Sequence, residues 1–312
     1  MSSLMTNSSA MTALQTLRTV SQNLATTENR ISTGFRVATA SDNSAYWSIA
    51  TTMRSDNQAL SAVSDALGLG AATVDTMYTA LTSVVGDSKG GLTALKAKLT
   101  AALEPGVDRV KVQSEITAIQ ADLKNTAGLA VFNGENWLSV DSSVVGYNAT
   151  KSVVSSFSRV GGKVGISTID VDINALKLYD PAGAGPAVGI MDKTRTVGTT
   201  TAAVATLDIS TLTDSAVDRQ KLQDYIQMVD DALGNVTQSS ADLGAVKTRI
   251  DSNSNFIKSL RDAIDRGVGQ LVDADMNAES TRLQALQVQQ QLGTQALSIA
   301  NQGSQSILSL FK

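Results

Sequence analysis

Residues 283–311 read LQALQVQQQLGTQALSIANQGSQSILSLF, a stretch without a single charged side chain. Its large apolar residues recur at helical spacing, and glutamines and serines fill many of the positions between them. These apolar residues include Leu283, Leu286, Leu292, Leu297, Ile299, Ile307, Leu310 and Phe311. The pattern predicts a helix that lacks the charged face of an ordinary surface helix. Such a helix needs helical neighbours on several sides.

The opposite end of the chain has the same property. The first 17 residues carry no charge, and Leu14, Leu17, Leu24 and Ile31 continue a helical stripe from there. Residues 1–33 and 279–312 carry three charges each, which leaves 48 of the 54 charged residues for the middle of the chain. We therefore predict that the apolar residues of both ends form self-assembly surfaces.

Burial of these side chains recovers less free energy than the ordering of some thirty backbone residues costs, because each ordered residue loses about 1–2 kcal/mol of conformational entropy. Helix hydrogen bonds and contacts on several sides are needed in addition. We expect both ends to be disordered in the free monomer and to fold when they pack against other copies.

Composition excludes several classes of function. The net charge is -4 and no basic cluster is present, which argues against nucleic acid as a partner. The chain has no cysteine and no histidine, so disulfides are excluded and the commonest general base is missing. No constellation of base, nucleophile or metal ligands is visible. We expect no enzyme activity, no cofactor and no metal.

One segment begins like a calcium loop. Asp170, Asp172 and Asn174 place oxygen ligands at alternate positions, as such a loop requires. Ala175 and Pro181 stand where the glycine and the glutamate of that loop are expected. A metal site is therefore disfavoured here.

The beginning of the chain lacks the basic start, apolar run and cleavage site of a secretory signal peptide. Glutamines interrupt even the C-terminal stretch, so no segment is apolar enough to span a bilayer. The sequence predicts no membrane insertion and either a cytosolic protein or one exported without cleavage.

Heptad-like apolar runs dominate the middle of the chain. The longest extend from Tyr46 to Val84 and from Leu222 to Leu271, and shorter ones cover 92–99 and 112–123. A straight helix over 222–271 would be about 75 Å long and could not bury its apolar stripe alone. These runs predict a bundle of long, roughly antiparallel helices.

Between about residues 131 and 216 the pattern changes. Glycine and β-branched residues become more frequent, and apolar residues alternate with polar ones from Val164 to Ile173, which is the period of a strand. The predicted fold class is mainly α, with a long antiparallel helical bundle or coiled coil formed from both chain ends and a small β-rich lobe inserted between helices. Trp47 and Trp137 are expected to be core anchors.

The stretch from Arg30 to Ala50, RISTGFRVATASDNSAYWSIA, is predicted to be a hinge between two helices. Gly34 can end the first helix, Arg36 can pair with Asp42, and residues 41–43 offer N-cap side chains for the next helix.

This stretch also resembles the signature that follows the first helix of bacterial flagellins, Arg-x-Ser-x-Gly-x-Arg followed by Ala-x-Asp. Further similar elements are Gln113-Ser114-Glu115-Ile116, the Phe132-Asn133-Gly134 turn, Val272-Asp273-Ala274-Asp275 and the glutamine-rich C-terminal helix. The segments Tyr46–Ala50 and Gly134–Trp137 are similar to those of alphaproteobacterial, rhizobial-type flagellins. The resemblance covers nearly everything outside residues 139–218.

The resemblance implies a structural subunit of the flagellar filament that is exported unfolded by the flagellar type III apparatus and polymerises, alone or with other flagellins, into a hollow helical propeller for motility. Residues 1–33 with 279–312 would form the terminal coiled-coil domain of the inner tube, 34–138 with 219–278 the helical body of the outer tube, and 139–218 a variable lobe. An export chaperone, the filament cap and hook-associated proteins are the other implied partners.

The chain departs from the flagellin pattern at one site. Many flagellins carry an arginine and a leucine on the helix that an animal Toll-like receptor contacts, and the matching positions here are Ala94 and Lys98. Glu115 matches an acidic residue of the same site. We expect weak receptor activation.

Two alternatives remain at this stage. A hook–filament junction protein resembles flagellins at its terminal helices but diverges in the signature and body. A cytosolic coiled-coil scaffold would share the heptad runs but would be absent from sheared cell-surface filaments.

Overall fold

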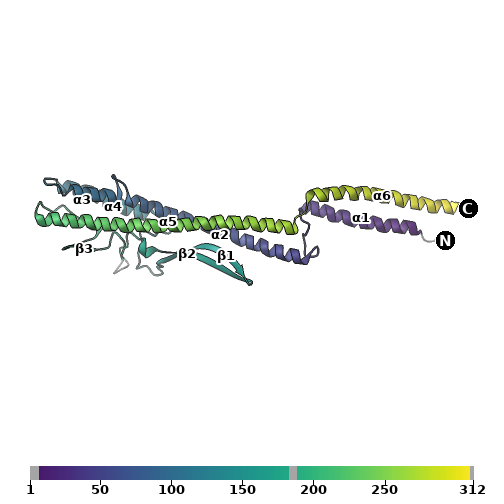
Figure 1. Ribbon diagram of the computed structural model, residues 1–312, viewed down its shortest axis with the longest axis horizontal. Helices are drawn as coiled ribbons and strands as arrows, with labels where there is room; N and C mark the ends of the chain where they lie inside the picture. Colours follow the sequence, from purple (N-terminus) through teal and green to yellow (C-terminus); the bar gives the residue numbers. More distant parts are fainter. Residues whose placement is uncertain (1–6, 183–187, 310–312) are drawn as a thin grey trace. The chain divides into compact units, whose positions relative to one another are not determined.

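The computed structural model describes residues 7–182 and 188–309, with the side chains of 304–309 left out (Figure 1). In chain order the helices are α1 Ser8–Thr33, α2 Ser44–Val85, α3 Gly91–Ala101, α4 Arg109–Leu129, α5 Ala216–Val272 and α6 Met276–Ser309. The strands are β1 Thr150–Val160, β2 Lys163–Asp172, β3 Arg195–Val197 and β4 Thr200–Ala202, with short 3-10 helices η1 Ile173–Ala175 and η3 Val204–Thr206. The predicted class, mainly α with a β-rich insertion, is confirmed.

The chain divides into two compact units, Met1–Gln58 with Leu260–Lys312 and Ala59–Ser259. In the first, α1 and α6 lie side by side (Figure 1), and the beginning of α2 packs against the end of α5. The core of that contact is Val37, Ala50, Val268 and Val272, with Phe35, Met53, Ile264 and Leu271 packed around it. Both chain ends therefore meet in one unit, as the sequence predicts.

In the second unit the remaining parts of α2 and α5 pack with α3 and α4. The heptad positions face inward, since Leu60, Leu67, Val74, Met77, Leu81, Leu92, Leu95, Leu99, Ile116, Leu123, Leu222, Val229, Val236, Leu243, Ile250 and Ile257 are all buried. Ion pairs from Lys247 to Asp75 and from Lys96 to Asp230 border this core. The predicted helical runs are confirmed.

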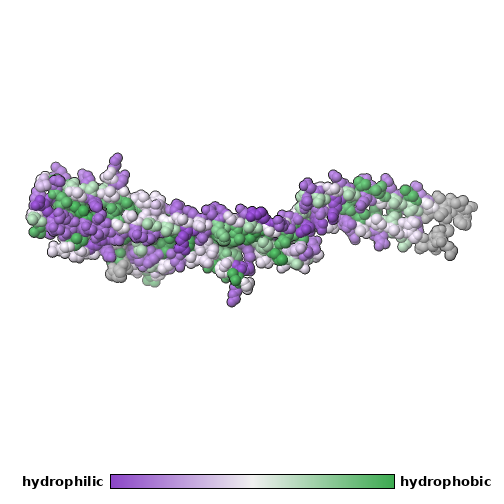
Figure 2. Space-filling view, viewed as in Figure 1, coloured by the Kyte–Doolittle hydropathy of each residue, from purple (hydrophilic) through white to green (hydrophobic). Residues whose placement is uncertain are grey.

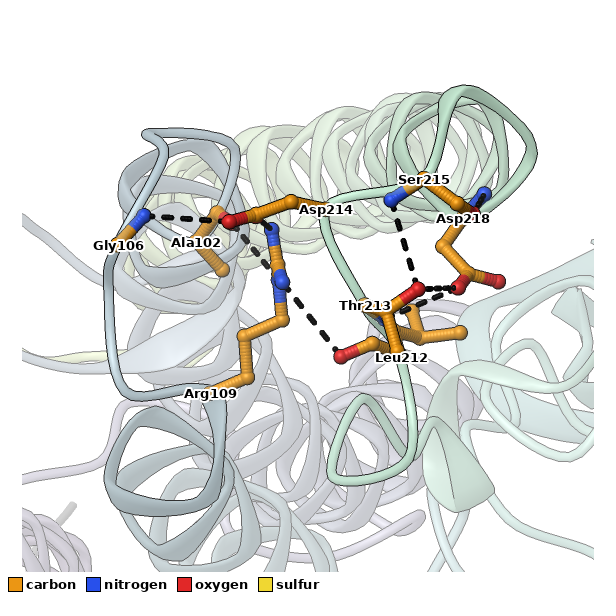
Figure 3. A network of polar contacts seen from close by, with 8 residues as sticks. All are labelled: Ala102, Gly106, Arg109, Leu212, Thr213, Asp214, Ser215 and Asp218. Atoms are coloured by element: carbon orange, nitrogen blue, oxygen red, sulfur yellow. Dashed lines mark hydrogen bonds and ion pairs between the residues drawn. The ribbon is translucent and has the colours of Figure 1, made fainter.

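A polar network fixes the start of α5 (Figure 3). The buried guanidinium of Arg109, at the start of α4, donates to the carbonyl of Ala102 at 3.2 Å and pairs with the Asp214 carboxylate. Next to this ion pair, the backbone N–H and the hydroxyl of Thr213 both donate to the carboxylate of Asp218. Hydrogen bonds with Thr213 and Ser215 lower the pKa of Asp218 to about 2. The network ties the α3–α4 turn to the segment that leads into α5.

The lobe contains two small antiparallel sheets, β1 with β2 and β3 with β4. The β1–β2 hairpin has a bulge between Val154 and Ser156, and its inner half is buried through Val153, Ile169 and Val171. Gly70 of α2 makes room for it, since a Cβ there would lie 2.2 Å from a methyl carbon of Val153. This close approach explains why Gly70 interrupts the apolar run of α2.

The two tryptophans differ. Trp137 is buried, and its indole N–H donates to Glu135 at 3.1 Å, which confirms it as a core residue. Trp47 is 37% exposed, so the expectation that it anchors the core is wrong. The physical reason is that it lies in the first turn of α2, beyond the reach of the last turn of α5.

The Phe132-Asn133-Gly134 turn has the geometry its sequence indicates. Asn133 and Gly134 both adopt positive φ, 50° and 80°, and the backbones of Phe132 and Glu135 exchange two hydrogen bonds of 2.9 Å. Two central residues with positive φ define a tight hairpin turn.

Candidate functional site

The α1–α6 pair begins and ends with specific caps. The side chain of Asn7 accepts from the N–H of Ala10 at 3.0 Å and donates to the carbonyl of Ala300 at 2.9 Å, so one residue caps α1 and bonds to α6. Gly34 ends α1 with φ 75°, and its N–H donates to Arg30. Asp275 caps α6 by accepting from the N–H groups of the second and third residues after it. The predicted role of Gly34 as a helix stop is confirmed.

An ion pair crosses the two helices near the hinge. A guanidinium nitrogen of Arg30 lies 3.0 Å from Oε1 of Glu279, whose side chain is only 10% exposed. The other oxygen, Oε2, is buried and has no hydrogen-bond partner within the described residues. The carboxylate of Glu279 therefore depends on Arg30 for its compensation.

The signature residues between α1 and α2 bind the end of α5. The N–H groups of Arg36 and Val37 donate to the carbonyl of Val272 at 2.7 and 3.2 Å, and the guanidinium of Arg36 donates to the carbonyl of Leu271 at 3.0 Å. The prediction that Arg36 pairs with Asp42 is wrong. The open carbonyls at the C-terminus of α5 attract the cation instead.

Asp42 has a different partner set. Its carboxylate accepts from the backbone N–H groups of Ala38 and Thr39 at 3.0 and 2.9 Å and from the Thr39 hydroxyl, and the bond from the Thr39 backbone is the main reason that its pKa is lowered. Asn43 caps α2 by accepting from the N–H of Tyr46 at 3.0 Å, as the predicted N-cap cluster allows. Asp42 thus shapes the turn and Asn43 starts the helix.

The predicted assembly residues divide between the seam of the pair and its outer surface. Leu286 is buried, together with Val20, which the sequence reading did not select. Leu17, Leu24, Ile31, Leu283 and Leu297 are partly buried, whereas Leu14, Leu292 and Ile299 are exposed. The side chain of Ile307, and Leu310 and Phe311 altogether, lie outside the described residues. Met11 and Val288, which the sequence pattern does not single out, are also exposed.

A shallow groove of about 460 Å³ runs between the two helices. Small side chains line it, namely Ser9, Thr12, Ala13, Thr16, Gly293 and Ala296. A Cβ added to Gly293 would lie 3.0 Å from a methyl carbon of Leu17, so the glycine allows the helices to approach. Apolar surface continues along α6 on the face that Figure 2 shows. A small-residue groove flanked by exposed large apolar side chains is suited to helix packing.

Other kinds of site are less well supported. Among residues 7–182 and 188–309, no three His, Cys, Asp or Glu side chains are grouped so that they could hold a metal ion. A larger cavity of about 600 Å³ lies beside β3 and α5 and is lined by residues that include Arg195, Asp230 and Asp231. None of the described helices combines the length and apolar character needed to cross a membrane.

Comparisons with known proteins identify the family. The model for the bacterial flagellin N-terminal helical region matches residues 4–142, and that for the C-terminal helical region matches residues 226–311. Flagellin C of Rhizobium meliloti (strain 1021) is 48% identical over 332 aligned residues, which cover 100% of both chains. The chain belongs to the bacterial flagellin family. Flagellin A of Rhizobium meliloti is 41% identical over 404 aligned residues, and a flagellin of Brucella melitensis biotype 1 is 43% identical over 313, each with both chains fully covered.

This flagellin is a structural subunit of the bacterial flagellar filament, of the rhizobial type that its sequence resembles. Nothing in the comparisons favours a hook–filament junction protein or a cytosolic scaffold. Membership of this family points to a structural protein rather than an enzyme.

Replacing Arg30 tests the ion pair. In Arg30→Met the carboxylate of Glu279 stays buried with neither oxygen paired, which should cost roughly 1–3 kcal/mol and lower the midpoint temperature of filament depolymerisation. Glu279→Gln, which removes the charge, should restore part of the loss in the double variant. Arg282→Met, at an exposed arginine of α6, is the matched control. Equal midpoints for Arg30→Met and Arg282→Met would contradict the assigned role.

Proposed function

We propose that copies of this flagellin join through the outer surface of the α1–α6 pair. The observation that carries the proposal is the exposure of large apolar side chains on helices with almost no charge. Leu292 is 58% exposed and Ile299 69%, and Met11 on α1 is 63% exposed. Exposed apolar surface of this extent on a filament subunit is expected to be covered by neighbouring copies.

The polar residues of the pair suit the same role. The amides of the glutamines on α6 can donate and accept hydrogen bonds across packed helices, without the cost of removing an ion from water. A surface that meets a different surface of the next copy produces an open helical filament when the rotation between copies does not close into a ring. Helix pairs from successive copies would then line the lumen.

The proposed division of labour follows the resemblance to flagellins. Residues 1–33 and 279–312 would form the inner tube, 34–138 and 219–278 the outer tube, and 139–218 a lobe whose role in filament contacts is open to test by deletion. The compact units of the fold have other boundaries, since the unit that contains the chain ends, Met1–Gln58 with Leu260–Lys312, also includes residues 34–58 and 260–278 of the proposed outer tube.

Export and partners are part of the same proposal. The chain would leave the cell unfolded through the flagellar type III apparatus, without cleavage, and meet an export chaperone, the filament cap and hook-associated proteins. A chain without cysteine needs no disulfide to refold outside the cell. Four relatives from Rhizobium meliloti, named flagellins A to D, support a filament built from more than one flagellin. A propeller subunit requires no catalysis or cofactor.

Substitutions on α6 test the assembly surface. Leu292→Ser or Ile299→Ser should each raise the critical concentration for polymerisation about 10- to 100-fold, because burying one such side chain contributes about 1.5–3 kcal/mol. Val164→Ser, at an exposed apolar residue of the β1–β2 hairpin, is the control and should change it less than threefold. Sedimentation of seeded protein measures the concentration. Wild-type values for both α6 variants would contradict the proposal.

Folding on assembly has a separate test. In dilute monomer we expect weak amide-exchange protection for α1 and α6, and strong protection for the buried heptad positions of α2 and α5. Filaments should protect all four helices. Strong protection of α1 and α6 in the monomer would show that the pair is stable without neighbours.

Weak activation of an animal Toll-like receptor is also proposed. Ala94 is buried in α3, and Lys98 forms an ion pair with Glu115, the acidic residue of that surface. A receptor that contacts an arginine and a leucine at these positions would find a buried alanine and an ion-paired lysine instead. In a reporter-cell assay this monomer should be much less active than an enterobacterial flagellin, and equal activity would overturn the expectation.

A further inference from the structure

The β1–β2 hairpin (Figure 1) has an inner half that packs on its unit and an outer half that does not. Val153, Ile169 and Val171 of the inner half are buried. In the outer half, which contains the turn, residues 158–168 are all exposed. The outer half of the hairpin therefore projects into solvent.

The two halves carry their apolar side chains on opposite faces. Successive residues of a strand point to opposite faces, so Ile169 and Val171 of β2 share the buried face. Val164 and Ile166 share the other face and are 55% and 65% exposed. Phe157 of β1 pairs with Ile166, which places it on the same outward face. The core of the unit lies on the opposite face, so it does not bury these side chains.

The outer half is also cationic. Between residues 156 and 169 the only charged residues in the sequence are Arg159 and Lys163, although the whole chain has a net charge of -4. Val160, which is 77% exposed, pairs with Lys163 next to the turn. We call the following residues the hairpin tip: Phe157, Arg159, Val160, Lys163, Val164 and Ile166.

This combination of charge and apolar surface fits the surface of an anionic bilayer. Acidic headgroups attract lysine and arginine side chains, and apolar side chains can enter the boundary between the headgroups and the acyl chains. A soluble acidic polymer would satisfy the two cations but would leave the apolar face in water. A bilayer accommodates both features of the tip.

We propose that the hairpin tip binds the surface of membranes that contain acidic lipids, without crossing them. Arg159 and Lys163 would contact the headgroups, and Val160, Val164 and Ile166 would enter the boundary below. A filament carries one tip for each subunit, so weak binding by single tips becomes strong when many of them engage one membrane. The tip lies outside the α1–α6 pair, and its binding does not depend on how copies join.

Vesicle flotation tests the charge requirement. The monomer should partition at least tenfold more strongly to vesicles of phosphatidylcholine with about one third phosphatidylglycerol than to phosphatidylcholine alone. Arg159→Gln and Lys163→Gln should each weaken partition to the anionic vesicles about fivefold. Lys111→Gln, at a lysine of α4 whose side chain is 85% exposed, is the matched control and should change it less than twofold. Equal partition to both kinds of vesicle, or wild-type partition of both tip variants, would overturn the proposal.

A single label tests contact of the apolar face with the bilayer. The chain has no cysteine, so Val164→Cys provides one site for an environment-sensitive fluorophore. Its emission should shift to shorter wavelength with anionic vesicles. The same label on Val217→Cys, at an exposed valine of α5, should not shift. An unshifted Val164→Cys label would overturn the proposal.

Two further measurements separate the membrane from other partners of the tip. Ile166→Ser should keep the circular dichroism and the critical concentration of the wild type while it binds anionic vesicles more weakly. A raised critical concentration would assign the tip to contacts between copies and overturn the proposal. Binding of filaments to polygalacturonate without binding to anionic vesicles would also overturn it, since the ligand would then be an acidic polysaccharide.

Discussion

Two packed helices can bury side chains only along the one line where they touch, and this constraint determines which residues at the ends of the chain are buried. The apolar residues of α1 and α6 are spread around each helix rather than along a single line, so pairing buries Val20 and Leu286 but leaves Leu292 and Ile299 in contact with solvent. In an ordinary surface helix, charged side chains would occupy these outer positions, and the two ends have almost none. Charge is placed instead on the rest of the chain, where the heptad helices and the lobe supply their own cores. The subunit thus combines a part that packs internally with a part whose packing is incomplete.

Much of the fold could be predicted from the sequence because its causes are local. Heptad runs predict α2 and α5 at nearly their full lengths, since a stripe with helical period has no other way to be buried. The turn at Asn133-Gly134 follows from the conformations open to those two residues. The alternation from Val164 to Val171 predicts β2 for the same kind of reason. The stop at Gly34 requires only a residue that tolerates positive φ after a helical pattern.

The contacts of the site were harder to predict because they join distant parts of the chain. Arg30 and Glu279 are 249 positions apart, and neither has a neighbour in sequence that indicates the other. The sequence predicts a pair of Arg36 with Asp42 because that carboxylate is close along the chain. The exposure of Trp47 depends on where α5 ends relative to α2, which is a property of the register and not of either helix. No pattern within one segment contains that information.

The end of α5 shows why the signature segment has its particular residues. An α-helix leaves its last carbonyls without partners, and a basic residue in the last turn or a glycine after it commonly supplies donors. The last turn of α5 has no basic residue, and Asp273 rather than glycine follows Val272. The donors come from the other half of the unit, as the guanidinium of Arg36 and the N–H groups of Arg36 and Val37. Because the last carbonyls of α5 accept their hydrogen bonds from a segment distant in the sequence, that segment holds the end of α5 in place. Gly34 and Arg36 are therefore linked in function, because α1 must stop at Gly34 for the next residues to reach the end of α5.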